Sequence, residues 1–375
     1  MVFEIRDPYK RKPHRLKALS GGRVTRALVS FRPDFLQTNA PTHQMNQGVS
    51  MESRYRAALI GCGGISYRHA RAYLEQGNVE IVAACDISEE NLNKVCDEFD
   101  ISSRYTSHET LLREQEVDLV SVCTYPKAHA EQTIAAAKSG VKAVLCEKPM
   151  CLGLGEADDM IETCRANGTK LVIAHRHRQN PNFTRARELI AEGAIGEPRL
   201  IWAYLTSAII DNGTHIVDLM RYLLGDPEAD WVMGHASRQR DTLYQSSPAE
   251  ESGTGLIAFK TGTRALIEMG ELTPNDGFKF RILGSEGSLE AAIEGVDWFD
   301  KTGAHEFRAE PSQGFVEQTR EMIRWVEGGP EPRNPGEKGR AVTELLMAIH
   351  ESARTGAVVN LPLEARGYPM EERVD

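Results

Sequence analysis

The chain has 375 residues, which is too long for one ordinary hydrophobic core and predicts about two domains. Its formal net charge of -10 argues against a nucleic-acid partner, because such a partner requires a basic face. No apolar run approaches the ~18 residues of a membrane span, and 41% hydrophobic with 26% charged residues is typical of a soluble globular protein.

The N-terminal segment differs in composition from the rest of the chain. Residues 1–52 are rich in arginine and lysine and lack the long apolar core of a secretory signal. We interpret them as a basic, disordered extension, or as residues added by an upstream start codon, with a targeting or interaction arm as the alternative.

From residue 53 to residue 175, short apolar runs alternate with helical patterns. The predicted strands are residues 56–60, 79–85, 117–123 and 141–146. The predicted helices are residues 66–77, 88–99 and 128–140, with Ser88 capping the second and Gly140 closing the third. Because these strands are apolar on both faces, the pattern predicts an α/β domain with a parallel sheet between helices.

After residue 175, strand patterns follow one another with short turns between them. The predicted strands are residues 198–205, 231–237, 254–260, 263–270, 278–284 and 288–293. The predicted helices are residues 182–193, 215–225, 315–329 and 338–356. Residues 176–375 are therefore expected to form an α+β domain with an antiparallel or mixed sheet.

The cysteines indicate reduced thiols rather than a disulfide or metal framework. Their number is odd and they form no CxxC pair; they are Cys62, Cys85, Cys96, Cys123, Cys146, Cys151 and Cys164. Several lie in apolar runs, so we expect buried free thiols in a cytoplasmic protein and no metal site, with a structural zinc site as the alternative.

A glycine turn joins the first predicted strand to the first helix. Its sequence Gly61-Cys62-Gly63-Gly64-Ile65-Ser66 is a GxGxxS variant of the dinucleotide-binding motif. Gly61 permits the tight turn, Gly63 lets a pyrophosphate approach the backbone, and the helix N-terminus offers N–H groups to the phosphates.

Asp86 supports the same interpretation from the end of the second strand. A carboxylate there accepts hydrogen bonds from the adenosine ribose and repels the 2′-phosphate of NADP, an effect of about 4 kcal/mol for one close charge pair. No arginine follows Asp86, so NAD is predicted rather than NADP. An ordinary turn with a capping aspartate is the alternative.

Two further segments carry catalytic residue types. Glu147-Lys148-Pro149 follows the strand 141–146, at the sheet edge where α/β folds bind ligands, and Pro149 is a candidate cis proline. Asp211 precedes Thr214, a predicted N-cap, and His215, whose pKa is expected to be lowered slightly by the positive helix end. By spacing alone, such a histidine with a nearby aspartate is usually a capping arrangement, which is the alternative for this second segment.

Together these segments resemble the Gfo/Idh/MocA oxidoreductase family, which includes inositol dehydrogenase and glucose–fructose oxidoreductase. The similarity covers residues 55–362 and includes GCGGIS, AACDIS, VLCEKPM, RQNPNFTRARELI and DNGTHIVDLMRYLLG. The resemblance implies a Rossmann domain, a larger open-faced sheet domain, and homodimers or homotetramers formed through that exposed sheet.

The resemblance also implies roles for individual residues. The implied catalytic residues are Lys148, Asp211 and His215. The implied cofactor-binding residues are Gly61, Gly63, Gly64, Ile65, Asp86, Thr124, Pro126, His129, Glu147, Lys148 and Arg178. The implied substrate-binding residues are Lys148, His177, Asp211 and His215. The chain departs from the family in the short LTSAIIDNGTH segment and at Gln179, which leaves the identity of the substrate open.

These expectations combine into one mechanistic hypothesis. His215 takes the proton of a sugar or polyol hydroxyl while hydride passes to C4 of NAD, Lys148 stabilises the alkoxide, and Asp211 holds the imidazole. Lys148 and His215 could exchange roles. His175 and His177, on one face of a predicted strand, reach the substrate or serve as packing residues. The alternatives are an NAD-binding regulator without turnover and a glycosidase that uses redox-assisted elimination.

Overall fold

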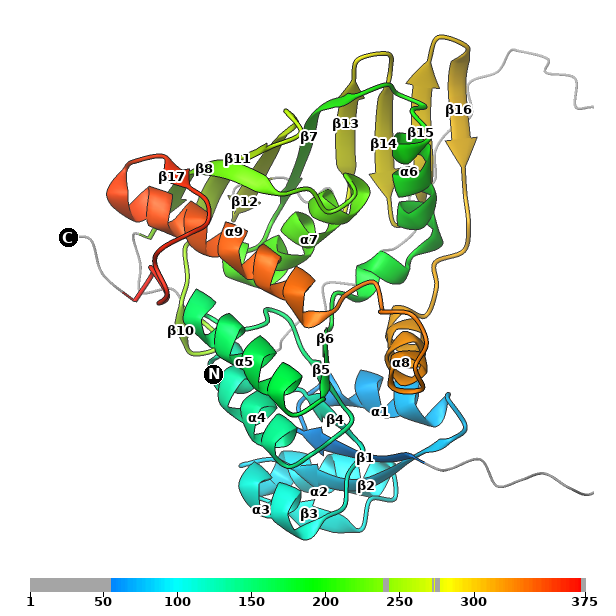
Figure 1. Cartoon of the computed structure of the whole chain (residues 1–375), viewed down its shortest axis with the longest axis vertical. Coiled ribbons are helices and arrows are strands. Elements are labelled where there is room, and N and C mark those ends of the chain that lie inside the picture. Colours follow the sequence, from blue (N-terminus) through cyan, green and yellow to red (C-terminus); the bar gives the residue numbers. More distant parts are fainter. Residues whose placement is uncertain (1–54, 239–242, 272, 274–276, 372–375) are drawn as a thin grey trace, which may run out of the picture. The chain divides into compact units, whose positions relative to one another are not determined.

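The computed structural model describes residues 55–238, 243–271, 273 and 277–371, so the predicted extension 1–52 lies outside the described residues. The described strands form a six-stranded sheet, a nine-stranded sheet and a short two-stranded hairpin. Figure 1 shows the two large sheets with their helices. No helix in the described ranges has both the length and the apolar character needed to cross a membrane.

The first sheet is entirely parallel, with the strand order β3-β2-β1-β4-β5-β6. Its strands are β1 Tyr55–Ile60, β2 Val79–Cys85, β3 Ser103–Tyr105, β4 Leu119–Val122, β5 Ala143–Cys146 and β6 Lys170–Ile173. Its helices are α1 Ser66–Leu74, α2 Glu89–Glu98, α3 His108–Glu114, α4 Pro126–Lys138 and α5 Leu154–Ala166. Separate apolar clusters cover the two faces, which confirms the predicted doubly covered sheet.

The second sheet has the order β16-β15-β14-β13-β7-β12-β11-β8-β17. Its strands are β7 Pro198–Leu205, β8 Ala229–Ser237, β11 Ser252–Phe259, β12 Arg264–Gly270, β13 Phe280–Gly284, β14 Ser288–Ala292, β15 Gly295–Asp300, β16 Gly303–Phe307 and β17 Val359–Asn360. Only the β7–β12 pair is parallel among these strands, so the predicted antiparallel or mixed character is confirmed.

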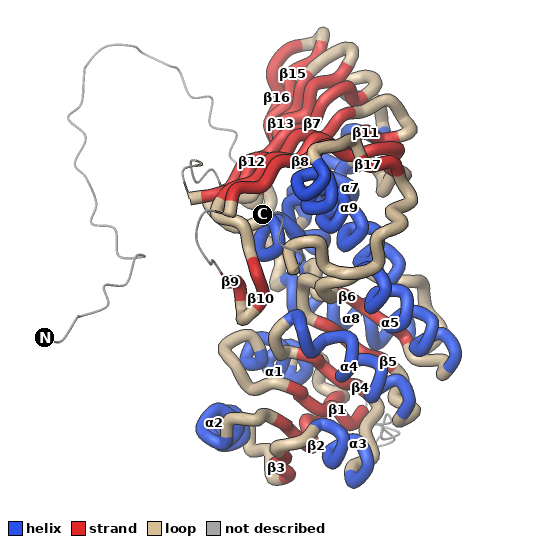
Figure 2. Tube along the Cα trace, turned by 90° about the vertical axis from the view of Figure 1, so that its left-hand side faces the viewer, coloured by secondary structure: helices blue, strands red, loops and turns tan. Residues whose placement is uncertain are grey.

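Helices cover one face of the nine-stranded sheet. They are α6 Pro181–Ala191, α7 Thr214–Leu223 and α9 Gly336–Thr355, and their apolar residues share one core with the sheet. Figure 2 shows α7 and α9 along one side of the sheet. The small hairpin consists of β9 Leu243–Tyr244 and β10 Ser247–Pro248.

One helix from late in the sequence returns to the first sheet. The residues Met322 and Ile323 of α8, which spans Gly314–Val326, belong to the same apolar cluster as Leu59 of β1 and Tyr73 of α1. Figure 1 shows α8 beside α1. All seven cysteines are buried and free, as their positions in apolar runs predict.

Candidate active site

The turn after β1 requires glycine at its first position. Gly61 has a φ of +94°, and a Cβ there would lie 2.7 Å from the carbonyl carbon of Cys123 and 2.8 Å from Cγ2 of Thr124. At Gly63 and Gly64, in contrast, no described atom lies within 4 Å of the Cβ position. Packing therefore explains Gly61, whereas packing against the described residues does not explain glycine at the next two positions.

Asp86 holds this turn with its carboxylate. One oxygen accepts a 2.6 Å hydrogen bond from the backbone N–H of Cys62, and the other accepts a 2.7 Å bond from the N–H of Ser88. Each carboxylate oxygen has a second lone pair, so the group keeps acceptor capacity for a ribose hydroxyl. The position of Asp86 thus depends on the glycine turn.

A cavity of about 410 Å³ opens beside this turn, within the usual size range of small-molecule sites. Its lining includes Gly61, Gly63, Asp86 and Thr124, four of the residues predicted to bind the cofactor, together with Tyr125. The helix α1 begins directly after the turn, and its N-cap Ile65 makes no side-chain capping bond. These residues fit the adenosine and phosphate groups of a dinucleotide.

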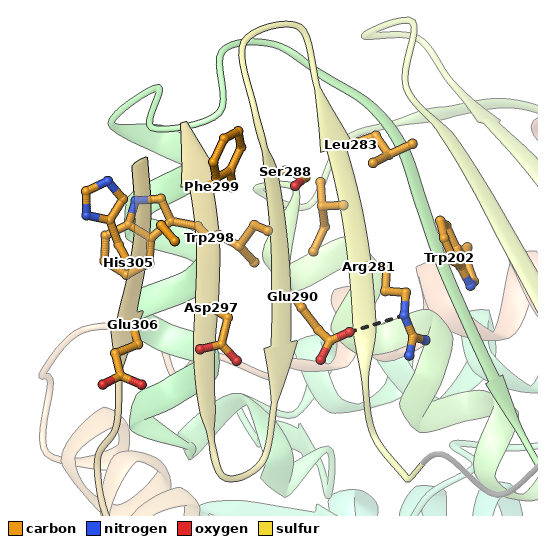
Figure 3. Close-up of a pocket in the computed structure, with 13 residues that line it drawn as sticks. Trp202, Arg281, Leu283, Ser288, Glu290, Asp297, Trp298, Phe299, His305 and Glu306 are labelled. Carbon is orange, nitrogen blue, oxygen red and sulfur yellow. Dashed lines mark ion pairs between the residues drawn. The ribbon is translucent and has the colours of Figure 1, made fainter. Parts of the chain in front are cut away.

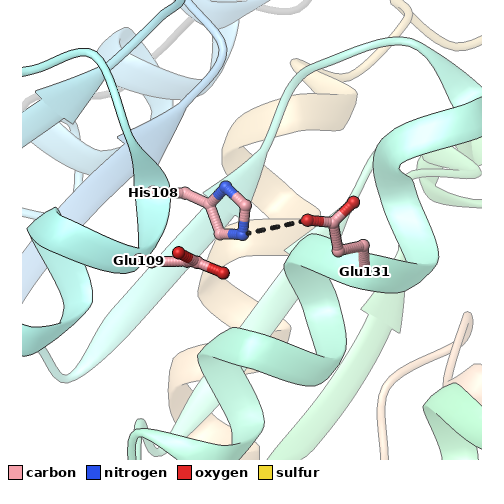
Figure 4. Close-up of side chains that lie close together, drawn as sticks. All are labelled: His108, Glu109 and Glu131. Carbon is pink, nitrogen blue, oxygen red and sulfur yellow. Dashed lines mark ion pairs between the residues drawn. The ribbon is translucent and has the colours of Figure 1, made fainter.

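His108 lies at the rim of this cavity beside two glutamates. The imidazole Nε2 is 3.8 Å from Oε1 of Glu131, and Figure 4 shows Glu109 next to the same ring. The ligand atoms of these three side chains lie within 4.8 Å of one another, but both glutamates are exposed. Exposed carboxylates commonly cluster without an ion, so the predicted absence of a metal site stays a prediction.

His129 tethers two loops and does not line the cavity. Its ring is fully buried, with Nδ1 2.9 Å from the carbonyl oxygen of Pro149 and Nε2 3.0 Å from that of Thr124. Burial lowers the pKa of His129, and a neutral ring donates to only one of these two acceptors at a time. Pro126, another predicted cofactor residue, is buried at the start of α4.

Lys148, which follows the strand β5 of the first sheet, forms an ion pair with Asp211, which lies between β7 and α7 of the second domain. The ammonium Nζ lies 3.0 Å from Oδ1 of Asp211, and the peptide bond between Lys148 and Pro149 is cis, as its sequence context suggested. The second carboxylate oxygen of Asp211 accepts hydrogen bonds from Ser207 and from Asn212. Asp211 therefore holds the lysine rather than His215, which corrects the predicted Asp211–His215 pairing.

His215 is surrounded by rings instead of a carboxylate. Its centroid lies 4.8 Å from that of His177 and 5.7 Å from that of Phe278, and its Nδ1 is buried without a hydrogen-bond partner among the described residues. Burial, followed by electrostatic interactions with His177 and Lys148, holds the pKa of His215 well below its usual value. Burial, not the helix end, is therefore the main cause of its neutrality.

The local structure around these histidines differs from the prediction. A π-helical turn, Ile209–Gly213, runs directly into α7, so the hydroxyl of Thr214 makes no cap and lies 3.0 Å from Nε2 of His175. His177 belongs to a 3-10 turn, Arg176–Gln179, and His175 directly precedes it, so neither residue lies in a strand. Burial lowers the pKa of His177 to about 3, so this ring is also neutral at pH 7.

The assignment of Arg178 to the cofactor is not supported by its position. Its guanidinium is completely buried and lies 2.7 Å from Oδ1 of Asp218 and 2.8 Å from Oδ1 of Asp226. It also donates to the carbonyl oxygen of Arg333. These partners occupy its donors, so we assign Arg178 a structural role in place of the predicted one.

Several residues that contribute to the site were not anticipated. His69 bonds the carboxylate of Glu147 at 2.8 Å, Phe278 covers His177 and His215, and Tyr244 places its ring 6.0 Å from Nζ of Lys148. Burial and the nearby Asp211 raise the pKa of Tyr244. His69 had a weak signal, because a histidine in the first turn of an otherwise apolar helix face calls for a polar partner.

Register in the first sheet explains how the predicted residues come together. Ile60, Val122 and Cys146 are direct neighbours at the ends of β1, β4 and β5. The glycine turn, the segment beginning at Cys123 and the segment beginning at Glu147 therefore leave the sheet at the same edge. This is the edge at which open α/β sheets bind ligands.

Comparison with known proteins agrees with this geometry. Residues 55–175 match the model of an oxidoreductase family with an NAD-binding Rossmann fold, and residues 202–290 match the GFO/IDH/MocA C-terminal domain. D-apiose dehydrogenase of Paraburkholderia graminis is 26% identical over 348 residues, covering 82% of this chain and 90% of that protein. D-xylose 1-dehydrogenase (NADP(+)) 2 of Haloferax volcanii is 27% identical, covering 81% and 98%.

A solved structure shows the same fold over a similar length. Levoglucosan dehydrogenase, in complex with NADH and levoglucosan, aligns with a TM-score of 0.74 at 20% identity and covers 82% of this chain and 100% of that chain. Both family models and both sheets thus lead to one conclusion. The chain belongs to the Gfo/Idh/MocA oxidoreductase family.

Proposed function

We propose that this protein is an NAD-dependent oxidoreductase that transfers hydride between nicotinamide and a hydroxyl or keto carbon of a sugar, cyclitol or related polyol. The observation that carries the proposal is the joint arrangement of the site. A glycine turn with Asp86 faces a nucleotide-sized cavity, and the Lys148–Asp211 ion pair and the neutral His215 belong to adjoining segments. The names of the relatives, which act on sugars, support the substrate class.

The chain's own residues would divide the chemistry as follows. When bound, the nicotinamide accepts or donates hydride at C4. Lys148, held by Asp211 at 3.0 Å, would donate a hydrogen bond to the substrate oxygen and stabilise its developing charge. His215, kept neutral by burial, would accept the hydroxyl proton. In the alternative assignment, Lys148 and His215 exchange these roles.

We further propose NAD rather than NADP as the cofactor. The carboxylate of Asp86 lines the cavity, and the next residue is the exposed Ile87. No lysine or arginine is among the described residues that line the cavity, so none there can pair a 2′-phosphate. The relative from Haloferax volcanii is named for NADP(+), so the preference has to be measured on this protein. Comparing kcat/KM for the two cofactors tests it directly.

The central experiment mixes the protein with NAD and a panel of polyols and sugars and follows the absorbance of reduced nicotinamide. We expect turnover with at least one compound and its loss in Lys148→Met. NAD binding without turnover on the whole panel would favour a non-catalytic regulator. Release of sugar from a glycoside without net NADH would favour redox-assisted elimination.

We also propose that residues 176–375 form a domain that mediates homo-oligomerisation through the open face of the nine-stranded sheet. Met233, Leu256, Leu266, Trp202 and Arg281 are consecutive register partners across this sheet. A shallow cavity of about 700 Å³ lies on this sheet, and Leu283 and Phe299 are among the residues that line it, as Figure 3 shows. A second copy of the chain is the proposed occupant, and light scattering of Leu266→Glu tests it: the variant is expected to be monomeric.

A further inference from the structure

A buried polar network lies beneath the segment that carries Lys148. The ring of His69, 1% exposed on α1, has Nε2 2.8 Å from Oε1 of Glu147 and Nδ1 3.0 Å from Oγ of Ser121 on β4. The hydroxyl of Ser121 lies 2.9 Å from that of Tyr73, which is also buried. This network therefore connects α1, β4 and the end of β5 within an otherwise apolar core.

The network ends on the backbone of the lysine. The second carboxylate oxygen of Glu147 accepts a 3.1 Å hydrogen bond from the N–H of Lys148, whose Nζ is 3.0 Å from Asp211. Glu147 is only 6% exposed, and both of its oxygens have partners within the protein. Its carboxylate thus links the fold of α1 to the position of Lys148.

The direction of these hydrogen bonds follows from the chemistry of the groups. A carboxylate only accepts, so Nε2 of His69 carries the hydrogen that points at Glu147. The hydroxyl of Ser121 donates to that of Tyr73, so its oxygen is left to accept a hydrogen from Nδ1 of His69. The contact with Ser121 thereby fixes the orientation of the ring, with Nε2 directed at Glu147.

We propose that His69 is a positioning residue, which keeps the Glu147 carboxylate ionised and oriented so that Glu147 fixes the backbone of Lys148 for catalysis. This inference rests on the proposed function of Lys148. His129 restrains the other side of the same segment through the carbonyl oxygen of Pro149 at 2.9 Å. The segment is thus fixed from both sides by buried imidazoles, but only His69 acts through an ionisable side chain.

The charge of Glu147 makes this role measurable through pH. Burial alone would raise the pKa of Glu147, but the hydrogen bond and charge of His69 and the charge of Lys148 lower it below its usual value. The other groups that interact electrostatically with this carboxylate are Cys123, His129, Cys146, His175, Arg176 and Tyr244. Without His69 the balance shifts toward burial, so the pKa of Glu147 rises and the group protonates at higher pH.

The test compares His69→Leu, which removes the donor, with His69→Gln, whose amide can still donate to Glu147. In His69→Leu we expect kcat to fall about 10- to 100-fold, because small misplacements of a catalytic group have effects of this order, while NAD affinity measured by calorimetry stays within about threefold. The loss should be largest at acid pH and shrink as pH rises and Glu147 ionises. His69→Gln should recover most of kcat and the wild-type pH profile.

A role in packing alone predicts different results. Equal losses in both variants, with melting temperatures lowered alike and no change in the pH profile, would overturn the proposal, as would wild-type kinetics in His69→Leu. The double variant with Glu147→Gln should lose the altered pH dependence, since no carboxyl group remains to titrate.

A spectroscopic measurement separates this inference from the proposed function. If the wild type turns over no polyol, the proposed function fails, yet the state of Glu147 can still be observed. Infrared difference spectra over a pH series should show a protonated carboxyl band that persists to higher pH in His69→Leu than in the wild type and that is absent from the double variant. A band that disappears at the same pH in His69→Leu and in the wild type would contradict the proposed role of His69.

Discussion

Replacing Arg178 tests whether this arginine serves the fold or the cofactor. The variant Arg178→Met keeps the length of the side chain but removes the guanidinium that lies between Asp218 and Asp226. Asp218 is fully buried, and of its ion-pair partners among the described residues only His175 would remain, with its Nδ1 3.5 Å away. Removing one partner of such a buried pair costs about 3–5 kcal/mol, because a buried charge is left uncompensated.

The pH dependence of the free energy of unfolding gives a second measure of what these ion pairs contribute. Burial would raise the pKa of Asp226, but Arg178 and Lys338 lower it to about 2. From an unfolded value near 3.9, that depression corresponds to roughly 2.6 kcal/mol at neutral pH. Because the folded pKa is depressed, this stability is present above about pH 4 and is lost as the pH falls through about 2. In Arg178→Met this loss of stability at acid pH should be smaller, because the guanidinium no longer lowers the pKa of Asp226.

The assay is urea and thermal denaturation at pH 7 and at pH 3.5, together with NAD calorimetry. We expect the melting temperature of Arg178→Met to fall by on the order of 10 °C, with NAD affinity of the folded protein nearly unchanged. The matched control is Arg185→Met, whose exposed pairs with Glu188 and Glu192 are worth less than about 1 kcal/mol. A variant of normal stability that fails to bind NAD would refute the structural role and restore the assignment to the cofactor.

Three further outcomes follow from the site. Lys148→Met should lower kcat at least about 100-fold with little change in NAD affinity, because the lysine is expected to act on the reacting oxygen, as steady-state kinetics and calorimetry can check. Asp86→Ala should reduce the preference of kcat/KM for NAD over NADP by at least about tenfold, and an unchanged ratio would contradict the role of its charge. Because burial keeps the pKa of His215 well below its usual value, this base stays neutral as the pH falls from 8 to 6.5; a kcat profile with an acid limb in that range that disappears in His215→Gln would contradict this.

Sequence patterns predicted the elements whose burial is periodic or continuous. The strand patterns at 79–85 and 198–205 agree residue for residue with β2 and β7. The strands β15 and β16 were missed, since their sequences GVDWFD and GAHEF mix charged residues with small ones on a half-exposed sheet edge. The helix α5 was also missed, and the strand predicted to carry His175 and His177 is the four-residue β6, which ends at Ile173 before both histidines.

For the site, the residue types were easier to predict than their partners. Lys148, Asp211 and His215 could be selected from their motifs, but the pairing of Asp211 with Lys148 joins residues 63 positions apart and depends on how two sheets approach each other. The same holds for Arg178, whose motif is local while its acidic partners lie 40 and 48 positions further along. Local spacing carries no information about such contacts.

The return of α8 to the first sheet has a consequence for synthesis of the chain. A ribosome releases β1 to β6 long before Met322 and Ile323, which complete the apolar layer over α1 and β1. Until those residues emerge, the nascent nucleotide-binding half presents an uncovered apolar surface. A fragment ending near residue 175 would keep that surface permanently and should aggregate, whereas the same fragment joined to α8 should be less prone to do so.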